Sequence, residues 1–463
     1  MSRALHIFYQ NLRLRDNPSL VEACHNDSLL ALYIHQEGGR WAMGSASKVW
    51  LHKSLALLAS SLKDHGIHLH LAKGDFVKKV LEYVHDNQIT DVYFDVPIEP
   101  GLFNFAEMKN GLEKKNVNLH LYFHSILYSP SEIKTQGGEP YQVFTPFYNA
   151  TKKSKMPDKP LQVPSKFPHN IKAETLDLEA FHLIPKIKWH TDFENVFEIG
   201  EAGALKTLEA FLKKRVHDYK KDRDFPNLDG TSMLSPHLHF GEISPHQIFH
   251  RLDGHSEEPY KRQLIWREFA HHLLYHFPKT PLKPLKEKYE HFPWHKNAAL
   301  LKKWQEGMTG FPIIDAGMRQ LWQTGWMHNR VRMIVGSFLV KDLMIPWQEG
   351  ADWFWDCLVD ADLANNTLGW QWVAGCGADA APYFRVFNPY IQSVKFDEEG
   401  DYIKHFVPEL ARLDKKYIHA PHEAPKEVLE KAGIELGKTY PRPMVNHQEA
   451  KDEALKIYYK WNA

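Results

Sequence analysis

Short apolar runs alternate with helix-like segments from residue 4 to about residue 125. The runs include ALHIFY, SLLALYIH and DVYFD, and the segments between them include SKVWLHKSLALLASSLKDHG and DFVKKVLEYVHDNQ. Buried strands that alternate with amphipathic helices are typical of a parallel sheet with helices on both faces. The pattern therefore predicts a doubly wound, Rossmann-like α/β domain over residues 1–125. No GxGxxG follows the first run, so the phosphate loop of an ordinary dinucleotide-binding domain is missing.

The remainder of the chain follows two other patterns. Residues 126–198 include SKMPDKPLQVPSKFPHN, a composition rich in Pro, Lys and Ser that predicts a long connector on the surface. Beyond it, stretches such as GALKTLEAFLKKRVHDYKKDRD place apolar residues at three- and four-residue spacing. We predict that residues 199–463 form an all-α domain, since 463 residues are too many for a single core.

Charge and cysteine content exclude several classes of protein. The 57 basic and 57 acidic residues cancel, so any patch that binds nucleic acid must be local. Cys24, Cys357 and Cys376 are isolated in the sequence, which argues against a disulfide framework, a zinc site or an iron-sulfur cluster; we expect no metal. No signal peptide is visible, and no apolar run reaches the roughly 20 residues of a membrane span. We expect a cytoplasmic monomer without membrane contact.

Polar and aromatic side chains gather in two places early in the helical region. Residues 230–245, GTSMLSPHLHFGEISP, offer hydroxyls and backbone N–H groups before a helix start, which suits an anion but also an ordinary cap and turn. In residues 263–278, the spacing places Gln263, Trp266 and Arg267 on one helical face. A Trp and an Arg there are also compatible with a core residue and a salt bridge.

Two further clusters lie closer to the C-terminus. Residues 324–347 form an apolar helix-like stretch that carries Asn329, Arg330, Arg332 and Met333. A buried arginine needs a carboxylate or phosphate partner, because an unpaired buried charge is very costly. Asp360 or Asp362 in the segment DADLANNTLGWQW can supply that partner.

Together these segments resemble the photolyase and cryptochrome family. The matching strings are LRLRDNPSL, YQVFTPFYNA, RDFPNLDGTSMLSPHLHFGEISP, LIWREF, WQEGMTGFPIIDAGMRQLWQTGWMHNRVRM and DADLANNTLGWQWVAGCGADAAPYFRVFNP. They run through nearly the whole chain, and the last two are too long for chance agreement. The resemblance implies an N-terminal α/β domain, a long connector and a helical domain that holds FAD. It also implies light-driven repair of pyrimidine dimers in UV-damaged DNA.

The resemblance assigns roles to individual residues. It implies that FAD is held by Tyr219, Thr231, Ser232, Leu234, Ser235, Gln263, Arg267, Asn329, Arg332, Asp360, Asp362 and Asn366. Asn366 matches the residue that faces flavin N5, and Arg332 would pair with Asp360. The rings of Trp294, Trp347 and Trp370 match a chain that carries electrons from the surface to the flavin, although a lone Trp is more often a core residue. Contacts with damaged DNA are implied for Arg223, Gln263, Trp266, Asn329, Arg330, Met333, Trp372 and Arg385.

Subtype and antenna depend on a few positions. WMHNR resembles class I enzymes for cyclobutane dimers, because enzymes for the (6-4) photoproduct have a second His in place of Asn329. Gln263 departs from the Glu typical of cyclobutane-dimer enzymes, which predicts competent but less efficient repair. Tyr260 stands at a position near the FAD where members of the family often have a Trp. Residues 98–103, IEPGLF, lack the Asn-Glu pair with which relatives hold a folate antenna, so a second chromophore, whether deazaflavin, folate or flavin, stays open.

Two other functions compete with repair. A photosensory cryptochrome would keep FAD and the tryptophan chain without the lesion pocket, and it often adds a long C-terminal tail, for which little sequence remains after TYPRPMVNHQEAKDEAL. An α/β nucleotide-binding protein with an unrelated helical domain would be colourless when purified.

Overall fold

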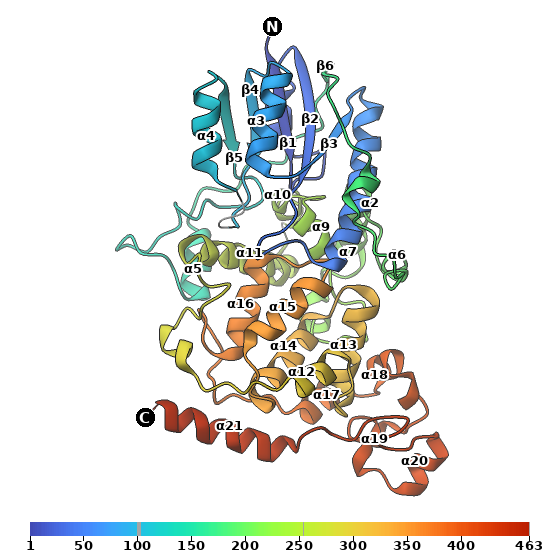
Figure 1. Ribbon diagram of the computed structural model, residues 1–463. Helices are drawn as coiled ribbons and strands as arrows, with labels where there is room; N and C mark the ends of the chain where they lie inside the picture. The colour runs from blue at the N-terminus through green and yellow to red at the C-terminus, as the bar shows by residue number, and fades with distance from the viewer. Residues whose placement is uncertain (100–102, 253, 463) are drawn as a thin grey trace. The chain divides into compact units, whose positions relative to one another are not determined.

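A parallel sheet dominates the N-terminal part of the computed structural model, which describes residues 1–99, 103–252 and 254–462 (Figure 1). Its strands are β1 (Arg3–Phe8), β2 (Ser28–His35), β3 (Leu69–Lys73), β4 (Asp91–Asp95) and β5 (Asn118–Tyr122), in the order β3-β2-β1-β4-β5. The chain adds strands in one direction from β1 and then in the other, so the predicted doubly wound sheet is confirmed. A two-residue strand, β6 (His169–Asn170), pairs with the start of β2.

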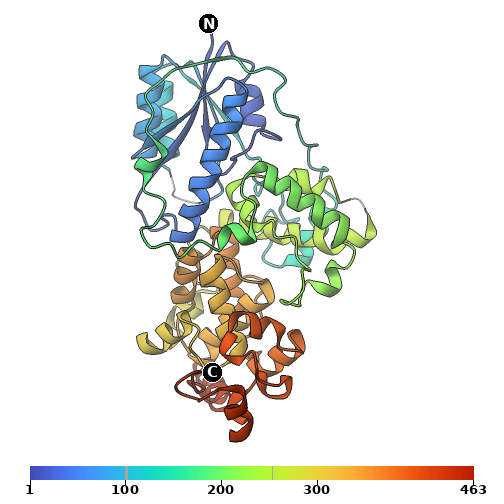
Figure 2. The same cartoon turned by 90° about the vertical axis from the view of Figure 1, so that its right-hand side faces the viewer.

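Helices cover both faces of this sheet (Figures 1 and 2). They are α1 (Pro18–Ala23), α2 (Ser45–Asp64), α3 (Phe76–Asp86) and α4 (Phe105–Glu113). In β1, Leu5 and Ile7 belong to the core cluster that includes residues of α3 and α4, whereas His6 points the other way and hydrogen-bonds Ser19 of α1. Both faces of β1 are therefore buried, which explains why its sequence from Ala4 to Phe8 is apolar except for the buried His6.

The connector has more structure than its composition predicts. It contains α5 (Phe144–Thr151), β6, the 3₁₀ turn η1 (Leu178–Phe181) and α6 (Phe193–Val196), separated by irregular chain. Phe144 and Phe147 of α5 are fully buried. This part of the connector packs by aromatic side chains, so it is not merely laid on the surface.

Helices make up the rest of the chain. They are α7 (Glu201–Lys214), α8 (Tyr219–Asp222), α9 (Ser235–Phe240), α10 (Pro245–Phe249), α11 (Glu258–His276), α12 (Ala298–Gln305), α13 (Pro312–Thr324), α14 (Asn329–Ser337), α15 (Trp347–Cys357), α16 (Leu363–Ala374), α17 (Pro389–Phe396), α18 (Asp401–Phe406), α19 (Lys415–Ile418), α20 (Lys426–Ala432) and α21 (His447–Asn462). Between α14 and α15 lies one π-helical turn, η4 (Phe338–Asp342), and the 3₁₀ turns are η2 (His255–Glu257), η3 (Glu287–His291), η5 (Pro408–Leu410) and η6 (Pro421–Glu423). The predicted helical C-terminal part is confirmed.

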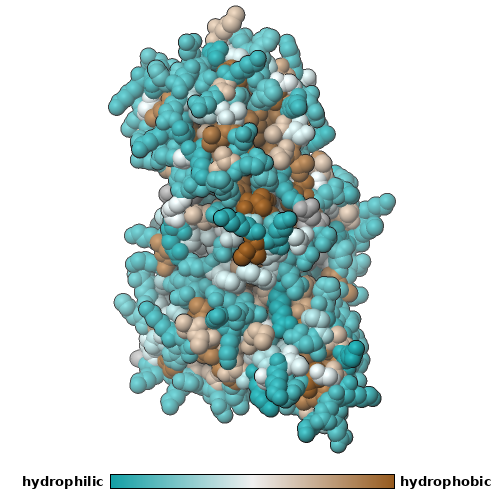
Figure 3. Space-filling model, turned by 45° about the vertical axis from the view of Figure 1, so that its right-hand side comes forward, coloured by the Kyte–Doolittle hydropathy of each residue, from teal (hydrophilic) through white to brown (hydrophobic). Residues whose placement is uncertain are grey.

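Backbone contacts divide the chain into two compact units. The first comprises Met1–Val216, Ser232–Pro278 and Val359–Ala361, and the second His217–Thr231, Lys279–Leu358 and Asp362–Ala463. These units are defined differently from the sequence segments 1–125, 126–198 and 199–463, which stay a prediction. Within the described residues, no helix combines the length and the apolar character that crossing a membrane requires. Figure 3 shows one face of the surface, which hydrophilic side chains cover for the most part.

Candidate functional site

One face of α11, in the first unit, carries three of the predicted side chains. Gln263, Trp266 and Arg267 are all partly exposed there, between buried neighbours such as Leu264 and Phe269. Arg267 donates from Nη1 to the carbonyl oxygen of Ser125 at 2.8 Å and to Glu268 Oε1 at 3.3 Å. The face therefore combines an amide, an indole and a guanidinium. Hydrogen bonds to Ser125 and Glu268 fix the position of the guanidinium.

The indole of Trp266 stacks on the ring of Phe144 from α5. The ring centroids are 3.7 Å apart and the planes are inclined by 6°. Phe144 is fully buried, and the guanidinium carbon of Arg262 lies 4.9 Å from the centroid of its ring. The stack fixes the indole plane before any ligand binds. The motif YQVFTPFYNA contains Phe144, but its part in supporting Trp266 gives no signal in the sequence.

The turn before α9 presents the predicted hydroxyl groups. Leu234 donates its backbone N–H to Ser232 Oγ at 3.3 Å, and Ser235 begins the helix. Met233 has a positive φ of 56°, which bends the chain sharply between the two serines. Hydroxyls and backbone N–H groups at such a turn are the donors that a phosphate requires.

A face of α16, in the second unit, carries Asp362, Asn366 and Trp370 at four-residue intervals. Asp362 caps the helix by accepting from the Asn365 N–H at 2.7 Å, and Asn366 donates from Nδ2 to the carbonyl oxygen of Ala351 at 3.0 Å. The Trp370 ring lies so close to α15 that a Cβ built on Gly350 would be 2.1 Å from its Cη2 atom. Gly350, which the sequence did not single out, is therefore required for this contact.

The three candidate electron-transfer tryptophans differ in burial. Trp347 and Trp370 are 2% and 3% exposed, whereas Trp294 is half-buried and its ring centroid lies 4.5 Å from that of Phe292. Two buried rings and one at the surface suit a path from the interior to solvent. Their role in electron transfer stays a prediction.

Helix α14 begins with the predicted lesion contacts. Asn329 is exposed, and its Nδ2 lies 3.9 Å from the sulfur of Met333 one turn later. Arg332 donates from Nε to the carbonyl oxygen of Met327 at 2.7 Å. His328, at the N-cap, is 2% exposed, and burial lowers its pKa to about 4, so this imidazole is neutral at pH 7.

The predicted DNA-binding arginines have different environments. Arg330 forms an ion pair with Asp224, and Arg223 Nε lies 3.9 Å from the same carboxylate. The guanidinium carbon of Arg223 is 5.2 Å from the Tyr219 ring centroid, whereas Arg385 is exposed on a loop. Asp224, which the sequence analysis did not assign a role, thus lies between two of the three arginines.

The remaining predicted residues differ in burial. Tyr219 is buried, which raises the pKa of its hydroxyl, while Thr231 and Trp372 are half-buried. Asp360 is 8% exposed and belongs to the first unit, whereas Arg332 belongs to the second. Their pairing stays a prediction.

Comparison with known proteins decides the family. The family described as DNA photolyase matches residues 4–165, and the FAD binding domain of DNA photolyase matches residues 260–460. The deoxyribodipyrimidine photo-lyase of Agrobacterium fabrum is 43% identical over 97% of this chain and 96% of its own. The chain belongs to the photolyase and cryptochrome family. The predictions of this family, of a photolyase-type enzyme and of FAD as cofactor are therefore confirmed at that level.

Other relatives of this chain include both photolyases and cryptochromes. Cryptochrome-2 of Arabidopsis thaliana is 35% identical over 97% of this chain and 77% of its own. A bacterial class III photolyase from Agrobacterium tumefaciens has a TM-score of 0.96 at 42% identity, covering 100% of this chain and 98% of that one. An archaeal photolyase from Sulfolobus tokodaii, solved with two FAD molecules, has a TM-score of 0.86 at 29% identity, covering 99% of this chain and 100% of that one.

The donors described above fit FAD. In the first unit, the Ser232–Ser235 turn has groups of the kind that bind phosphate. In the second unit, the α16 face has an amide and a carboxylate of the kind that binds a polar ring edge. That these residues hold FAD stays a prediction. The segment 98–103 is the one on which the sequence analysis based its expectation about a folate as second chromophore. Its residues 100–102 lie outside the described residues.

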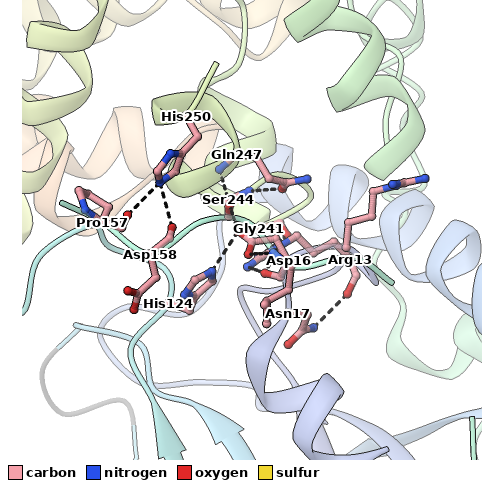
Figure 4. Close-up of polar contacts among 12 residues, drawn as sticks. Arg13, Asp16, Asn17, His124, Pro157, Asp158, Gly241, Ser244, Gln247 and His250 are labelled. Atoms are coloured by element: carbon pink, nitrogen blue, oxygen red, sulfur yellow. Dashed lines mark hydrogen bonds and ion pairs between the residues drawn. The ribbon is translucent and has the colours of Figure 1, made fainter. Parts of the chain in front are cut away.

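A separate buried cluster in the first unit surrounds Asp16. This carboxylate accepts from Ser244 and from the Leu161 N–H, and pairs with His124 at 3.0 Å (Figure 4). Burial alone would raise the pKa of Asp16, but the hydrogen bond and charge of His124 hold it below the ordinary value. The cluster joins the N-terminal segment, the end of β5, the connector and α10.

Asp16, His124 and His246 also have ligand atoms within 4.8 Å of one another. The imidazole rings of His124 and His246 stack, however, with centroids 4.0 Å apart and planes at 6°. A metal ion bonded to both must lie in both ring planes, and two parallel separated planes share no point. As arranged, these rings cannot share an ion. The absence of a metal site in the protein stays a prediction.

Proposed function

We propose that this chain repairs cyclobutane pyrimidine dimers in UV-damaged DNA when it is illuminated. The observation that carries the proposal is the stacked Trp266, whose indole is fixed by Phe144 and lies on the same helical face as Gln263 and Arg267. A dimer must leave the duplex to react, and an unstacked base gains from a rigid aromatic surface beside hydrogen-bonding groups. The close photolyase relatives support the same reaction.

FAD would be held by the side chains that the sequence predicts for it. We assign binding to Tyr219, Thr231, Ser232, Leu234, Ser235, Gln263, Arg267, Asn329, Arg332, Asp360, Asp362 and Asn366. When bound in its reduced form and excited by light, FAD supplies the electron that opens the dimer ring. The protein needs no nucleophile or general base for this bond scission, and its side chains bind, orient and exclude water.

DNA would be held by a local set of cations and by the lesion contacts. We assign Arg223, Arg330 and Arg385 to phosphates and Gln263, Trp266, Asn329, Met333 and Trp372 to the lesion. Because the net charge is zero, affinity must come from these few contacts and should fall by about 0.9 log unit per log unit of salt for each phosphate neutralised. We infer a monomer that acts in the cytoplasm.

The test is illumination of the prereduced holoenzyme with an oligonucleotide that contains one cyclobutane dimer. Dimer loss is measured by chromatography, with a dark sample and a (6-4) oligonucleotide as controls. We expect loss of the cyclobutane dimer in light alone. Trp266→Ala should weaken binding of damaged DNA by about 1–3 kcal/mol, while binding of undamaged DNA changes little. Repair of the (6-4) lesion alone would contradict the assignment to cyclobutane dimers.

The plant cryptochrome relative supports a second candidate, a light sensor without repair. Such a protein would bind FAD and reduce it in light but would not prefer damaged to undamaged DNA. The same oligonucleotides, tested in the dark, separate the two functions. Extraction of the bound chromophores and their absorption spectra would also show whether a deazaflavin, a folate or a second flavin accompanies FAD.

A further inference from the structure

An exposed turn in the second unit carries Arg385. The Arg385 N–H donates to the carbonyl oxygen of Pro382 at 2.9 Å, and the N–H of Val386 donates to that of Phe384 at 3.1 Å. Arg385 is exposed and Phe384 is 53% exposed. A tight turn therefore presents a cation and an aromatic ring to solvent.

The same turn is anchored from inside by Tyr383. This side chain is 1% exposed, its hydroxyl lies 3.2 Å from the sulfur of Met344, and its ring stacks on Tyr458 of α21 with centroids 4.7 Å apart. Tyr383 holds one side of the turn. It does not hold the peptide that follows Arg385.

Lys341 holds that peptide. It lies in the π-helical turn η4, its side chain is 1% exposed, and its Nζ donates to the carbonyl oxygen of Arg385 at 2.8 Å. The Tyr383 ring centroid is 5.6 Å from the same Nζ. A π-helical turn widens the helix locally and is often found at functional sites. Here it directs a buried ammonium to the carbonyl of a surface arginine.

The buried ammonium is costly. Burial lowers the pKa of Lys341 to about 8. The negative charge of the adjacent Asp342 acts to raise this pKa, and the positive charge of Arg385 acts to lower it further. Asp342 is in turn paired with His447 of α21. An apolar side chain of similar length would avoid the desolvation of a charge. Unlike an apolar side chain, the ammonium can donate a hydrogen bond to the Arg385 carbonyl oxygen.

We propose that Lys341 is a positioning residue for DNA binding, which fixes the turn 382–386 so that Arg385 meets a backbone phosphate of the damaged strand. This proposal rests on the proposed function, in which Arg385 contacts DNA. A charged donor holds a carbonyl about twice as strongly as a neutral one. The Arg385 turn is therefore held most firmly while Lys341 carries its proton. The titratable and charged groups near the Lys341 ammonium are Asp342, Arg385 and Tyr383.

The experiment compares Lys341→Met with Lys302→Met, which removes an exposed lysine paired with Glu306 on α12. Dark affinity for a dimer-containing duplex is measured by fluorescence anisotropy with holoenzyme at pH 7, together with flavin content and the thermal unfolding midpoint. We expect Lys341→Met to weaken binding about threefold to tenfold. Its flavin content should be unchanged and its unfolding midpoint equal or higher. Lys302→Met should change affinity less than twofold.

A double-mutant cycle separates the proposal from its premise. In an Arg385→Ala background, Lys341→Met should cause no further loss, because no guanidinium is left to position. If Arg385→Ala weakens binding and Lys341→Met does not, the positioning role is wrong. If Arg385→Ala itself has no effect, the proposed phosphate contact is wrong.

A second measurement needs no substitution at Lys341. Affinity of the wild type should decrease as pH rises through about 8, while that of Arg385→Ala should stay flat over the same range. Parallel profiles for the two proteins would overturn the proposal even if Lys341→Met failed to fold.

Discussion

Arg330 Nη2 lies 2.8 Å from Oδ1 of Asp224, and the guanidinium carbon of Arg330 is 4.4 Å from the centroid of the Phe396 ring. The ion pair is partly exposed, so its net contribution to stability is small. The ring supports the guanidinium independently of the carboxylate. A DNA phosphate that binds Arg330 therefore competes with Asp224 for the guanidinium but can leave the stack on Phe396 intact.

Asp224→Asn should strengthen DNA binding. Removal of the competing carboxylate frees Arg330, and we expect affinity for damaged and undamaged duplex to rise about threefold. The dependence of affinity on salt, measured by anisotropy, should become steeper. Asp401→Asn removes an equal charge from α18, where Asp401 faces Lys404, and should have less effect. Weaker binding by Asp224→Asn would mean that the carboxylate positions Arg330 and does not compete with phosphate.

Gly350→Ala should disturb α16. The added methyl group would lie 2.1 Å from Cη2 of Trp370, a distance that requires the ring or the helix to move. We expect a loss of about 1–3 kcal/mol in the free energy of unfolding and reduced flavin content. Gly369→Ala is the matched control, because nothing lies within 4 Å of a Cβ at Gly369 on the same α16. Its free energy of unfolding should rise by about 0.5–1 kcal/mol.

Acid should destabilise the sheet through His6. Burial lowers the pKa of His6 to about 3 from 6.5, so the folded state keeps this imidazole neutral. Its contribution to stability is complete above pH 6.5 and is lost as pH falls toward 3, because the unfolded chain binds the proton first. Between pH 7 and pH 5 the loss should be about 2 kcal/mol. His6→Gln should flatten the pH dependence of unfolding by urea, and an unchanged slope would assign the effect to other groups.

Trp294→Phe should slow photoreduction without affecting repair. Trp294 is the partly exposed ring of the predicted electron path, so its loss should slow light-driven reduction of oxidised FAD. Chemically prereduced enzyme should still split dimers at the wild-type rate. Trp461→Phe is a control that alters the same aromatic group, since Phe292 lies 4.5 Å from Trp294 and 5.1 Å from Trp461. Equal losses in both assays would make Trp294 structural.

The sequence predicts those features of the fold that depend on the regular spacing of residues within one strand or one helix. In β1, side chains alternate between two buried faces, so the strand appears as a mainly apolar run in which His6 is the exception. In α11, Gln263 and Trp266 lie on one face because helical spacing is fixed. Contacts between distant segments have no such signature. Phe144 beneath Trp266 and Lys341 beneath the Arg385 carbonyl depend on how separate elements pack, and neither residue differs in type from ordinary core or surface residues.

Gln263 is the position at which we expect this chain to depart from typical cyclobutane-dimer enzymes. It precedes Trp266 by three residues and Arg267 by four on α11, and all three side chains are partly exposed. An amide can accept from a thymine N–H and donate to a carbonyl oxygen, so we expect the proposed lesion binding to be retained. A carboxylic acid can in addition share its proton with a dimer carbonyl on which negative charge develops, and that interaction strengthens after the electron arrives.

Gln263→Glu should therefore raise the quantum yield of dimer splitting while lesion affinity changes little. Both quantities are measured on prereduced holoenzyme with the same dimer-containing oligonucleotide, the yield from dimer loss per absorbed photon and the affinity from anisotropy in the dark. Gln263→Met is the control, because it keeps the length of the side chain but can neither accept nor donate strongly; it should lower affinity and leave the yield of bound complexes at or below the wild-type value. A yield that rises with Glu and with Met alike would assign the effect to packing against Trp266. A yield that falls with Glu would show that a carboxyl group at this position hinders the reaction, and the cyclobutane-dimer assignment would lose its chemical basis at α11.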